Sequence, residues 1–249
     1  MSFGAIIIGD ELLSGKRRDK HFAQVIRILA ERGLELGWCR IIGDDPGMIV
    51  ETLCQTLASE AVVFCFGGIG ATPDDHTRVC AARAAGVALA PHADAVKEIE
   101  ARFGEAAYPQ RIRLAELPVG SAIIPNPFNR IPGFSLQHHH FLPGFPEMAW
   151  PMMIWLLDQR YRHLHRERPP IETSLLVWAR EGELLPLMQS FVERYPRCRL
   201  SSLPELHPER PRLELGVRGE ETEVLAALDY LQQELSALNI EWRHSRDVS

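Results

Sequence analysis

The sequence lacks the features of a membrane or secreted protein. No apolar run approaches the roughly 20 residues that a membrane-spanning helix needs. The first residues, Met1 to Gly9, contain no basic segment and read directly as a strand, so a cleavable leader is not expected. The five cysteines are odd in number and form no C-x-x-C pair, which favours reduced thiols over disulfides or a zinc site. We therefore expect a cytoplasmic protein with no membrane partner.

The chain also lacks an excess of positive charge. Its 249 residues carry 27 basic and 33 acidic side chains, which gives a formal net charge of -6. A protein that attracts nucleic acid over its whole surface has the opposite balance, so nucleic acid is not an expected partner. With 46% hydrophobic and 24% charged residues, the composition is that of an ordinary globular protein with one large or two small domains.

Residues 1–165 alternate between strand and helix patterns. Ala5 to Ile8 is a short apolar run, typical of a buried parallel strand. Asp19 is placed to cap a following helix, and Asp45 and Pro46 read as the N-cap and first residue of the next one. The expected apolar stripes are Phe22, Val25, Ile26 and Leu29, then Val50, Leu53, Cys54 and Leu57, and later Val79, Ala82 and Ala85.

This β-α-β-α-β-α order predicts an α/β fold, a three-layer and mostly parallel sheet with helices on both faces. In such a sheet, ligands bind outside the carboxyl ends of the strands. Residues 159–170 are charged and end in two prolines, so they are expected to form a linker. Residues 171–243 follow with a β-α-β-β-α order that predicts a small α+β domain.

The most informative segment follows the apolar run Ala61 to Phe66. Three glycines within four residues (67, 68 and 70) connect this expected strand to a helical pattern. A strand, a tight loop and a helix start together present free backbone N–H groups to an anion. Asp74 and Asp75 in the same loop would repel a bare phosphate. The site therefore needs a cation, a protonated partner or acid chemistry.

Ordinary structural roles stay open for several of these residues. Asp75 is also placed to cap the following helix, and that role is compatible with catalysis. Asp10 and Glu11 directly follow the first strand, where they can form a simple acidic turn or contact a ligand. A basic stretch can form a solvated face, or one or two of its members can hold ligand phosphates; it comprises Lys16, Arg17, Arg18 and Lys20.

Three consecutive histidines, His138, His139 and His140, suggest a metal site at first sight. Successive residues of a strand point to opposite faces of the sheet, so three in a row cannot converge on one ion. We therefore do not expect them to bind a metal.

Five short motifs occur in one order along the chain. They are G-D-E-L-L-S-G at 9–15, G-G-I-G-A-T-P-D-D at 67–75, N-P at 126–127, P-G-F at 132–134 and L-P-G-F-P at 142–146. Together they resemble the N-terminal domain of competence/damage-inducible protein A, a branch of the MoaB/Mog molybdopterin-binding family. The second domain resembles the small α+β module that follows it there. The sequence ends before the amidohydrolase of full-length members, so deamidation of nicotinamide mononucleotide is expected to be absent.

The resemblance implies a cleft at the strand ends that binds molybdopterin or an adenine nucleotide. In the competence-protein branch it implies a metal-dependent ADP-ribose pyrophosphatase, and in the molybdopterin branch an adenylyltransferase. A divalent ion such as Mg²⁺, Mn²⁺ or Co²⁺ would neutralise the phosphates and polarise the bond to be broken. We expect a homo-oligomer, and an oligomeric scaffold built through the small domain is compatible with an enzyme and with a non-catalytic binding protein.

Carried over residue by residue, the resemblance assigns catalytic roles to Asp44, with Asp45 as an alternative match, and to Asp75. Met148 stands where the family motif Pro-Gly-x-Pro-x-Glu has its glutamate, and Glu147 is displaced from that place by one position. A non-catalytic pterin or nucleotide carrier with the same cleft is therefore the alternative to an enzyme. The implied ligand contacts are Gly9, Asp10, Glu11, Gly67, Gly68, Gly70, Thr72, Asp74, Pro143 and Gly144.

Overall fold

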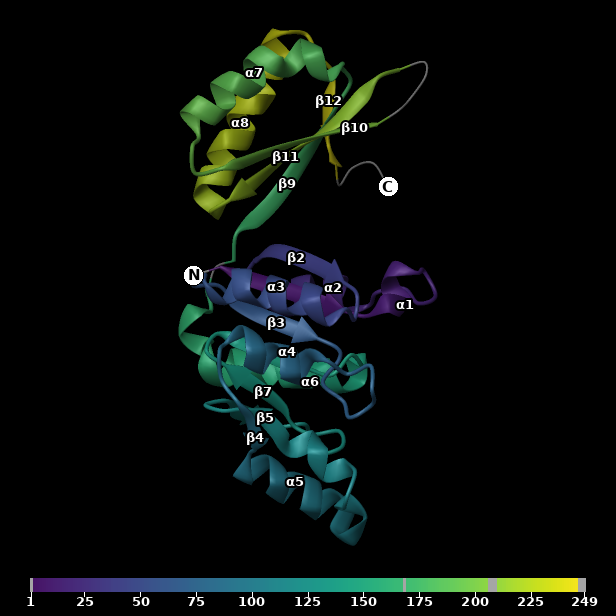
Figure 1. Ribbon diagram of the computed structural model, residues 1–249. Helices are drawn as coiled ribbons and strands as arrows, with labels where there is room; N and C mark the ends of the chain where they lie inside the picture. Colours follow the sequence, from purple (N-terminus) through teal and green to yellow (C-terminus); the bar gives the residue numbers. More distant parts are fainter. Residues whose placement is uncertain (1, 168, 206–209, 246–249) are drawn as a thin grey trace. The chain divides into compact units, whose positions relative to one another are not determined.

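The computed structural model describes residues 2–167, 169–205 and 210–245. The chain divides into two compact units, Met1–Glu167 and Arg168–Ser249, which can be located by the colour bar of Figure 1. None of the helices in the described parts of the chain has both the length and the apolar character needed to cross a membrane. The five cysteines carry free thiols.

The first unit is built around a six-stranded sheet of order β2-β1-β3-β8-β7-β6. Strands β2, β1, β3 and β8 are parallel, and β7 and β6 continue the sheet in antiparallel pairs, so the predicted mostly parallel sheet is confirmed. Strands β4 (Leu89–Pro91) and β5 (Glu116–Pro118) form a separate antiparallel pair. The strands of the large sheet are β1 (Phe3–Ile8), β2 (Leu36–Ile42), β3 (Val62–Phe66), β6 (Ala122–Ile124), β7 (Gly133–Leu136) and β8 (His139–Leu142).

Helices cover both faces of this sheet, because successive side chains of its central strands point to opposite sides. Ala5 and Ile7 join one buried cluster with residues of α2 and α6. Ile6 and Ile8 join another with residues of α3, α4 and α5, so the predicted three layers are confirmed. The helices are α1 (Asp10–Leu13), α2 (His21–Ala30), α3 (Pro46–Leu57), α4 (Thr77–Ala84), α5 (Ala93–Phe103) and α6 (Pro146–Arg160), with short 3-10 helices η1 (Gly104–Ala107), η2 (Arg111–Ala115) and η3 (Arg162–Leu164).

Two aspartates accept hydrogen bonds from the first N–H groups of helices, as the sequence predicts. Asp45 accepts a hydrogen bond from the Met48 N–H at 2.8 Å, and Pro46 is the first residue of α3. Asp19 accepts from the N–H groups of His21 at 2.9 Å and Phe22 at 2.8 Å at the start of α2. Each bond satisfies a backbone donor that has no partner within its own helix.

The predicted apolar stripes are wrong at four positions, because Phe22, Ile26, Cys54 and Val79 are exposed. Apolar residues at helical spacing fit more than one face of a helix, and packing against the neighbouring layer selects the buried face. The buried residues of α2 are His21, Val25, Ile28 and Leu29, and those of α4 are Thr77, Arg78, Cys80, Ala81 and Ala82.

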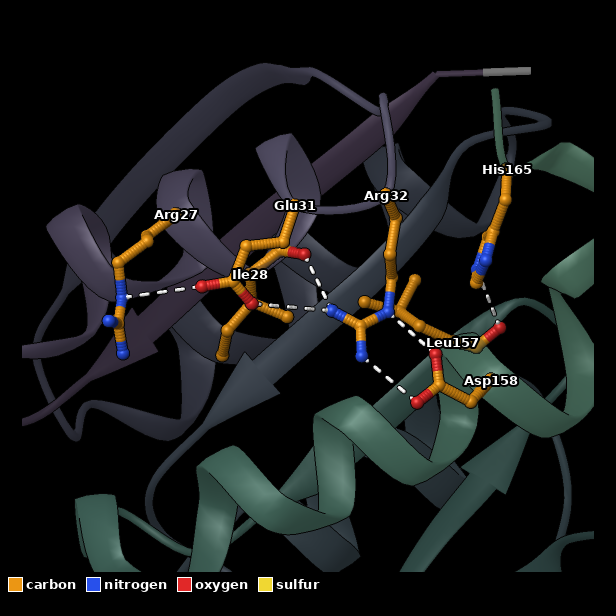
Figure 2. A network of polar contacts seen from close by, with 7 residues as sticks. All are labelled: Arg27, Ile28, Glu31, Arg32, Leu157, Asp158 and His165. Atoms are coloured by element: carbon orange, nitrogen blue, oxygen red, sulfur yellow. Dashed lines mark hydrogen bonds and ion pairs between the residues drawn. The ribbon is translucent and has the colours of Figure 1, made fainter. Parts of the chain in front are cut away.

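An arginine joins the C-terminal ends of α2 and α6 (Figure 2). Arg32 donates from Nε to Asp158 Oδ1 at 2.7 Å and from Nη2 to Asp158 Oδ2 at 2.9 Å, which is a two-pronged ion pair. The Arg166 N–H donates to Arg32 O at 3.0 Å, and His165 Nε2 lies 3.1 Å from Leu157 O. The predicted linker is therefore wrong for residues 159–166, which belong to the first unit. Residues 159–160 end α6, and residues 162–164 form η3.

The second unit is a four-stranded antiparallel sheet of order β10-β11-β9-β12 with two helices. Its order follows the predicted β-α-β-β-α pattern and adds a last short strand that the sequence pattern did not reveal. Leu238, the residue that follows the last helix, is exposed. The elements are β9 (Ile171–Val177), α7 (Glu181–Arg194), β10 (Arg199–Glu205), β11 (Arg212–Gly219), α8 (Glu221–Ala237) and β12 (Trp242–His244).

Candidate functional site

A cavity of about 470 Å³ lies at the carboxyl ends of the parallel strands of the first unit, and we call it the glycine-loop compartment. The segments that follow β1, β3 and β8 meet there, because these strands are neighbours in the sheet. Asp10 does not line this compartment, unlike the other residues expected at the site. Those that line it are Gly9, Glu11, Asp44, Gly67, Gly68, Gly70, Thr72, Asp74, Asp75, Pro143 and Gly144.

The glycine loop owes its shape to backbone conformations that favour glycine. Gly67 and Gly68 have φ angles of 105° and 66°. A Cβ on Gly67 would clash with Ile8 O, and one on Gly68 would clash with Thr77 Oγ1. Thr77 holds the loop from the other side, since its Oγ1 donates to Gly67 O at 2.9 Å and its N–H to Gly68 O at 2.9 Å. The loop is therefore fixed between β1 and the start of α4.

The turn of this loop leaves backbone donors available. In the described parts of the chain, the N–H groups of Gly68, Ile69 and Gly70 form no hydrogen bond. These residues also line the compartment. Consecutive unpaired N–H groups in a tight turn bind phosphate or other oxyanions.

A buried arginine supports the loop from behind. Arg78 in α4 is 8% exposed and donates from Nη2 to Gly70 O at 2.7 Å. Its Nη1 donates to Glu116 O at 3.0 Å and to Arg113 O. Burial lowers the pKa of this guanidinium, although it remains charged. Arg78 was not among the site residues expected from the sequence. Its position on the apolar side of α4 could have indicated that this arginine is buried.

Asp44 and Asp10 join the end of β2 to the start of α1. The Asp10 N–H donates to Asp44 Oδ2 at 2.8 Å, and the Asp44 N–H donates to Asp10 Oδ1 at 3.1 Å. Burial raises the pKa of the Asp44 carboxyl, and the hydrogen bond from the Asp10 N–H lowers it in part. The nearby negative charges of Asp10, Glu11 and Asp74 raise the pKa further. Asp10 thus positions Asp44, while Asp44 faces a concentration of negative charge that a cation would relieve.

Asp75 closes the turn of the glycine loop. Its Oδ2 accepts from the Thr72 N–H at 2.9 Å and from Thr72 Oγ1. Helix α4 begins at Thr77 with His76 before it, so the alternative role of Asp75 as an N-cap is wrong. The bonds to Thr72 hold the carboxylate in one orientation at the wall of the compartment.

A divalent cation at this site would need ligand phosphates in addition to protein carboxylates. No group of three or more His, Cys, Asp or Glu side chains in the described residues forms a ready cage for a metal. Asp44 and Asp75 each use Oδ2 in a hydrogen bond within the protein. Magnesium-like ions are commonly held by one or two carboxylates plus substrate phosphates, with oxygen ligands only. Asp44 and Asp75 would be those carboxylates.

Met148 occupies the position of the glutamate expected from the family motif. It lines the glycine-loop compartment, and Asn129 Nδ2 lies 3.3 Å from its sulfur. Glu147 lines a neighbouring cavity and not this one. The displaced carboxylate therefore does not take the place of the missing one. Asn126 and Asn129, which the sequence analysis did not assign to the site, also line the compartment.

The neighbouring cavity, about 380 Å³, we call the second compartment. His21 lies at its base, with its ring stacked on Phe66 at 4.4 Å between centroids. His21 Nε2 lies 3.0 Å from Gly144 O, and Nδ1 accepts from Trp150 Nε1 at 3.3 Å. This pattern requires the neutral ring with its proton on Nε2. Burial correspondingly lowers the pKa of His21.

The histidines of β8 do not form a site. His139 Nε2 lies 2.9 Å from Thr56 Oγ1 on one face of the sheet. On the other face, the two ring nitrogens of His140 lie 2.8 Å from Ser135 Oγ and 2.7 Å from Tyr161 OH. The expectation that neighbouring histidines point apart is confirmed. Burial lowers the pKa of His139 to about 4 and that of His140 to about 3, so both rings are neutral near pH 7.

Comparison with known proteins places this site in a family. The sequence profile of the family described as "Probable molybdopterin binding domain" matches residues 4–163, which include every residue of both compartments. The chain belongs to this family. A CinA-like protein of Geobacter sulfurreducens is 37% identical over 157 residues, which is 60% of this chain and 38% of that protein. The resemblance found in the motifs is thereby confirmed.

Two further relatives extend the comparison. A protein of Pyrobaculum calidifontis is 27% identical over 225 residues, which cover 85% of this chain and 84% of that protein. CinA from Thermoplasma acidophilum, a protein described as of unknown function, is 26% identical in sequence to this chain. Its crystal structure matches this fold with a TM-score of 0.58. It covers 63% of this chain and 96% of that chain. Matches to the CinA-like protein of Geobacter sulfurreducens span only 38% of its length, so its activity does not transfer directly.

Proposed function

We propose that the glycine-loop compartment binds the phosphates of an adenine nucleotide or of molybdopterin. One observation carries this proposal: three unpaired N–H groups and the carboxylates of Asp44 and Asp75 belong to residues that line one cavity. The N–H groups suit phosphate oxygens, and the carboxylates suit a cation that lies between them and the phosphates. A cavity of about 470 Å³ is within the usual range for small-molecule sites.

The reaction that suits this arrangement is hydrolysis of an ADP-ribose-like pyrophosphate to AMP and a sugar phosphate. A bound divalent ion would neutralise the phosphates and polarise the bond that breaks. The N–H groups of residues 68–70 would orient the phosphate under attack. Asp44 Oδ1 would take a proton from the attacking water, since Oδ2 is the oxygen that accepts the hydrogen bond from Asp10. The water oxygen bonds to phosphorus while the bridging P–O bond breaks, and the other phosphate leaves.

The experiment is incubation of the purified protein with ADP-ribose and Mg²⁺, Mn²⁺ or Co²⁺, with AMP measured by chromatography. We expect metal-dependent release of AMP that falls at least about a hundredfold in Asp44→Asn, as for loss of a general base. Asp94→Asn, a change of an exposed aspartate on α5, is the matched control. Release of AMP at the same rate by both variants, or no release with any metal, would exclude the hydrolase.

A non-catalytic carrier is the second candidate, and Met148 is the observation that favours it. Such a protein would bind AMP, ADP-ribose or molybdopterin in the same compartment without turnover. Calorimetric titration separates the two candidates. Binding with a 1:1 stoichiometry and no product supports the carrier, whereas absence of binding to all three compounds excludes both candidates. A cytoplasmic location and a homo-oligomeric state stay predictions from the sequence.

A further inference from the structure

The two compartments adjoin each other, because they share part of their lining. Ile8, Glu11, Arg17, Gly144 and Phe145 line both cavities. The shared residues come from the end of β1, from the segment after it and from the segment before α6. A ligand bound at the glycine loop therefore lies next to the second compartment.

Charged side chains are distributed unevenly between the two compartments. Asp44, Asp74 and Asp75 line only the glycine-loop compartment. Arg18 and Lys20 line only the second compartment, and Arg17 lines both. Within the described residues, no carboxylate comes within ion-pair distance of these three cations. The glycine-loop compartment is thus acidic, whereas the second compartment contains three cations that form no ion pair.

Three carboxylates also line the second compartment, so the formal charges of its lining balance. They are Asp19, whose two oxygens accept hydrogen bonds from the N–H groups of His21 and Phe22, and Glu11 and Glu147. None of the three forms an ion pair with Arg17, Arg18 or Lys20 within the described residues, so these cations stay free to pair with a ligand. His21 adds no charge, because its Nδ1 accepts a hydrogen bond from Trp150.

We propose that the second compartment binds a terminal phosphate of the ligand, separate from the phosphates held at the glycine loop. This proposal rests on the function proposed above, because that function places the rest of the ligand at the glycine loop. Arginine and lysine are the side chains that pair with phosphate, Arg18 by two-pronged hydrogen bonds and Lys20 as a point charge. A cavity of about 380 Å³ accommodates a phosphorylated sugar. The substrate class is therefore a nucleotide with an additional phosphate monoester.

The test compares ADP-ribose with two derivatives that differ only by one phosphate, ADP-ribose 2′-phosphate and ADP-ribose 1″-phosphate. Affinities are measured by calorimetry with Mg²⁺ present. At least one derivative should bind about tenfold more tightly than ADP-ribose, as expected for charge-assisted hydrogen bonds. The advantage should disappear in the double variant Arg18→Gln/Lys20→Gln. It should persist in Lys16→Gln, because Lys16 is an exposed cation of the same segment that lines neither compartment.

A second measurement separates failure of this proposal from failure of the proposed function. If none of the three compounds binds, binding at the glycine loop is wrong, and inorganic phosphate then tests the second compartment alone. At constant ionic strength, phosphate should raise the unfolding temperature of the wild type and of Lys16→Gln more than that of the double variant. Equal shifts in all three proteins, or a phosphate advantage that survives in the double variant, would overturn the proposal.

Discussion

Arg78 holds the carbonyl of Gly70 in place from within the protein: its Nη2 donates to Gly70 O at 2.7 Å while the arginine itself is 8% exposed. The same guanidinium binds the carbonyls of Arg113 and Glu116, so one buried side chain joins the glycine loop to the segment that leads into β5. A loop whose N–H groups bind an anion must keep those groups fixed, and Arg78 supplies part of that rigidity.

Replacing Arg78 by lysine should weaken both folding and ligand binding. Lysine keeps the charge but cannot reproduce the planar donor pattern, so at least one buried carbonyl loses its partner. The expected cost is about 1–3 kcal/mol in the free energy of unfolding. Denaturant unfolding measures it, and Arg83→Lys, at an exposed arginine of the same helix, is the control. Equal stability of the two variants would show that the guanidinium contacts are not structural.

Replacing Gly68 by alanine should destabilise the loop for two reasons. Its φ of 66° is costly for a residue with a Cβ, and that Cβ would clash with Thr77 Oγ1. Gly86→Ala is a matched control, since Gly86 has φ 67° and no atom within 4 Å of its Cβ position. We expect Gly86→Ala to lose about 1–2 kcal/mol from backbone strain alone.

The Gly68 variant should lose more than this control, and the difference measures the contact with Thr77. It should also bind AMP more weakly by calorimetry, whereas Gly86→Ala should bind it normally. Indistinguishable unfolding midpoints for the two variants would contradict the close approach of Gly68 to Thr77.

Acid should destabilise the first unit through His139 and His140. Both pKa values are lowered in the folded state, to about 4 and about 3, from the ordinary 6.5. Between those values and 6.5 the unfolded chain binds more protons than the folded protein does. The stability contributed by the neutral rings is therefore complete above pH 6.5 and is lost as pH falls. Each histidine should add about 1.4 kcal/mol per pH unit to the slope in that window.

Hydrogen exchange of the Phe141 and Leu142 amides at several pH values checks this slope in the strand that carries both rings. His140→Gln should reduce the slope of stability against pH by the contribution of one histidine, about 1.4 kcal/mol per pH unit. His138→Gln should leave it unchanged, because that side chain is exposed. A flat profile in the wild type would show that the rings are not buried as neutral groups.

Met148→Glu should restore a carboxylate to the wall of the glycine-loop compartment. We expect tighter binding of Mn²⁺ in the presence of AMP and, if the hydrolase proposal holds, faster release of AMP from ADP-ribose. Glu147→Gln should change neither, because Glu147 lines only the second compartment. Weaker metal binding in Met148→Glu than in the wild type would count against a cation at this wall.

Much of the fold was predictable because it follows from short-range patterns. The apolar runs that became β1 and β3 are continuous in the sequence, and both strands are buried along their whole length. Asp45 and Pro46 marked the start of α3, and the observed cap is the one that local chemistry prefers. Helix α5 was missed, because only Ala95 and Ile99 are buried on it and the remaining face is polar.

For the candidate site, the sequence by itself determined which loops follow the buried strands, because apolar runs and glycine spacing are patterns of consecutive residues. Only the tertiary structure decided what each polar side chain contacts: Asp10 turns to Asp44, Arg78 reaches Gly70, and Arg18 and Lys20 line a second cavity. The reason is physical. Side-chain hydrogen bonds and charge pairing depend on distances between segments far apart in the chain, and no local pattern encodes those distances.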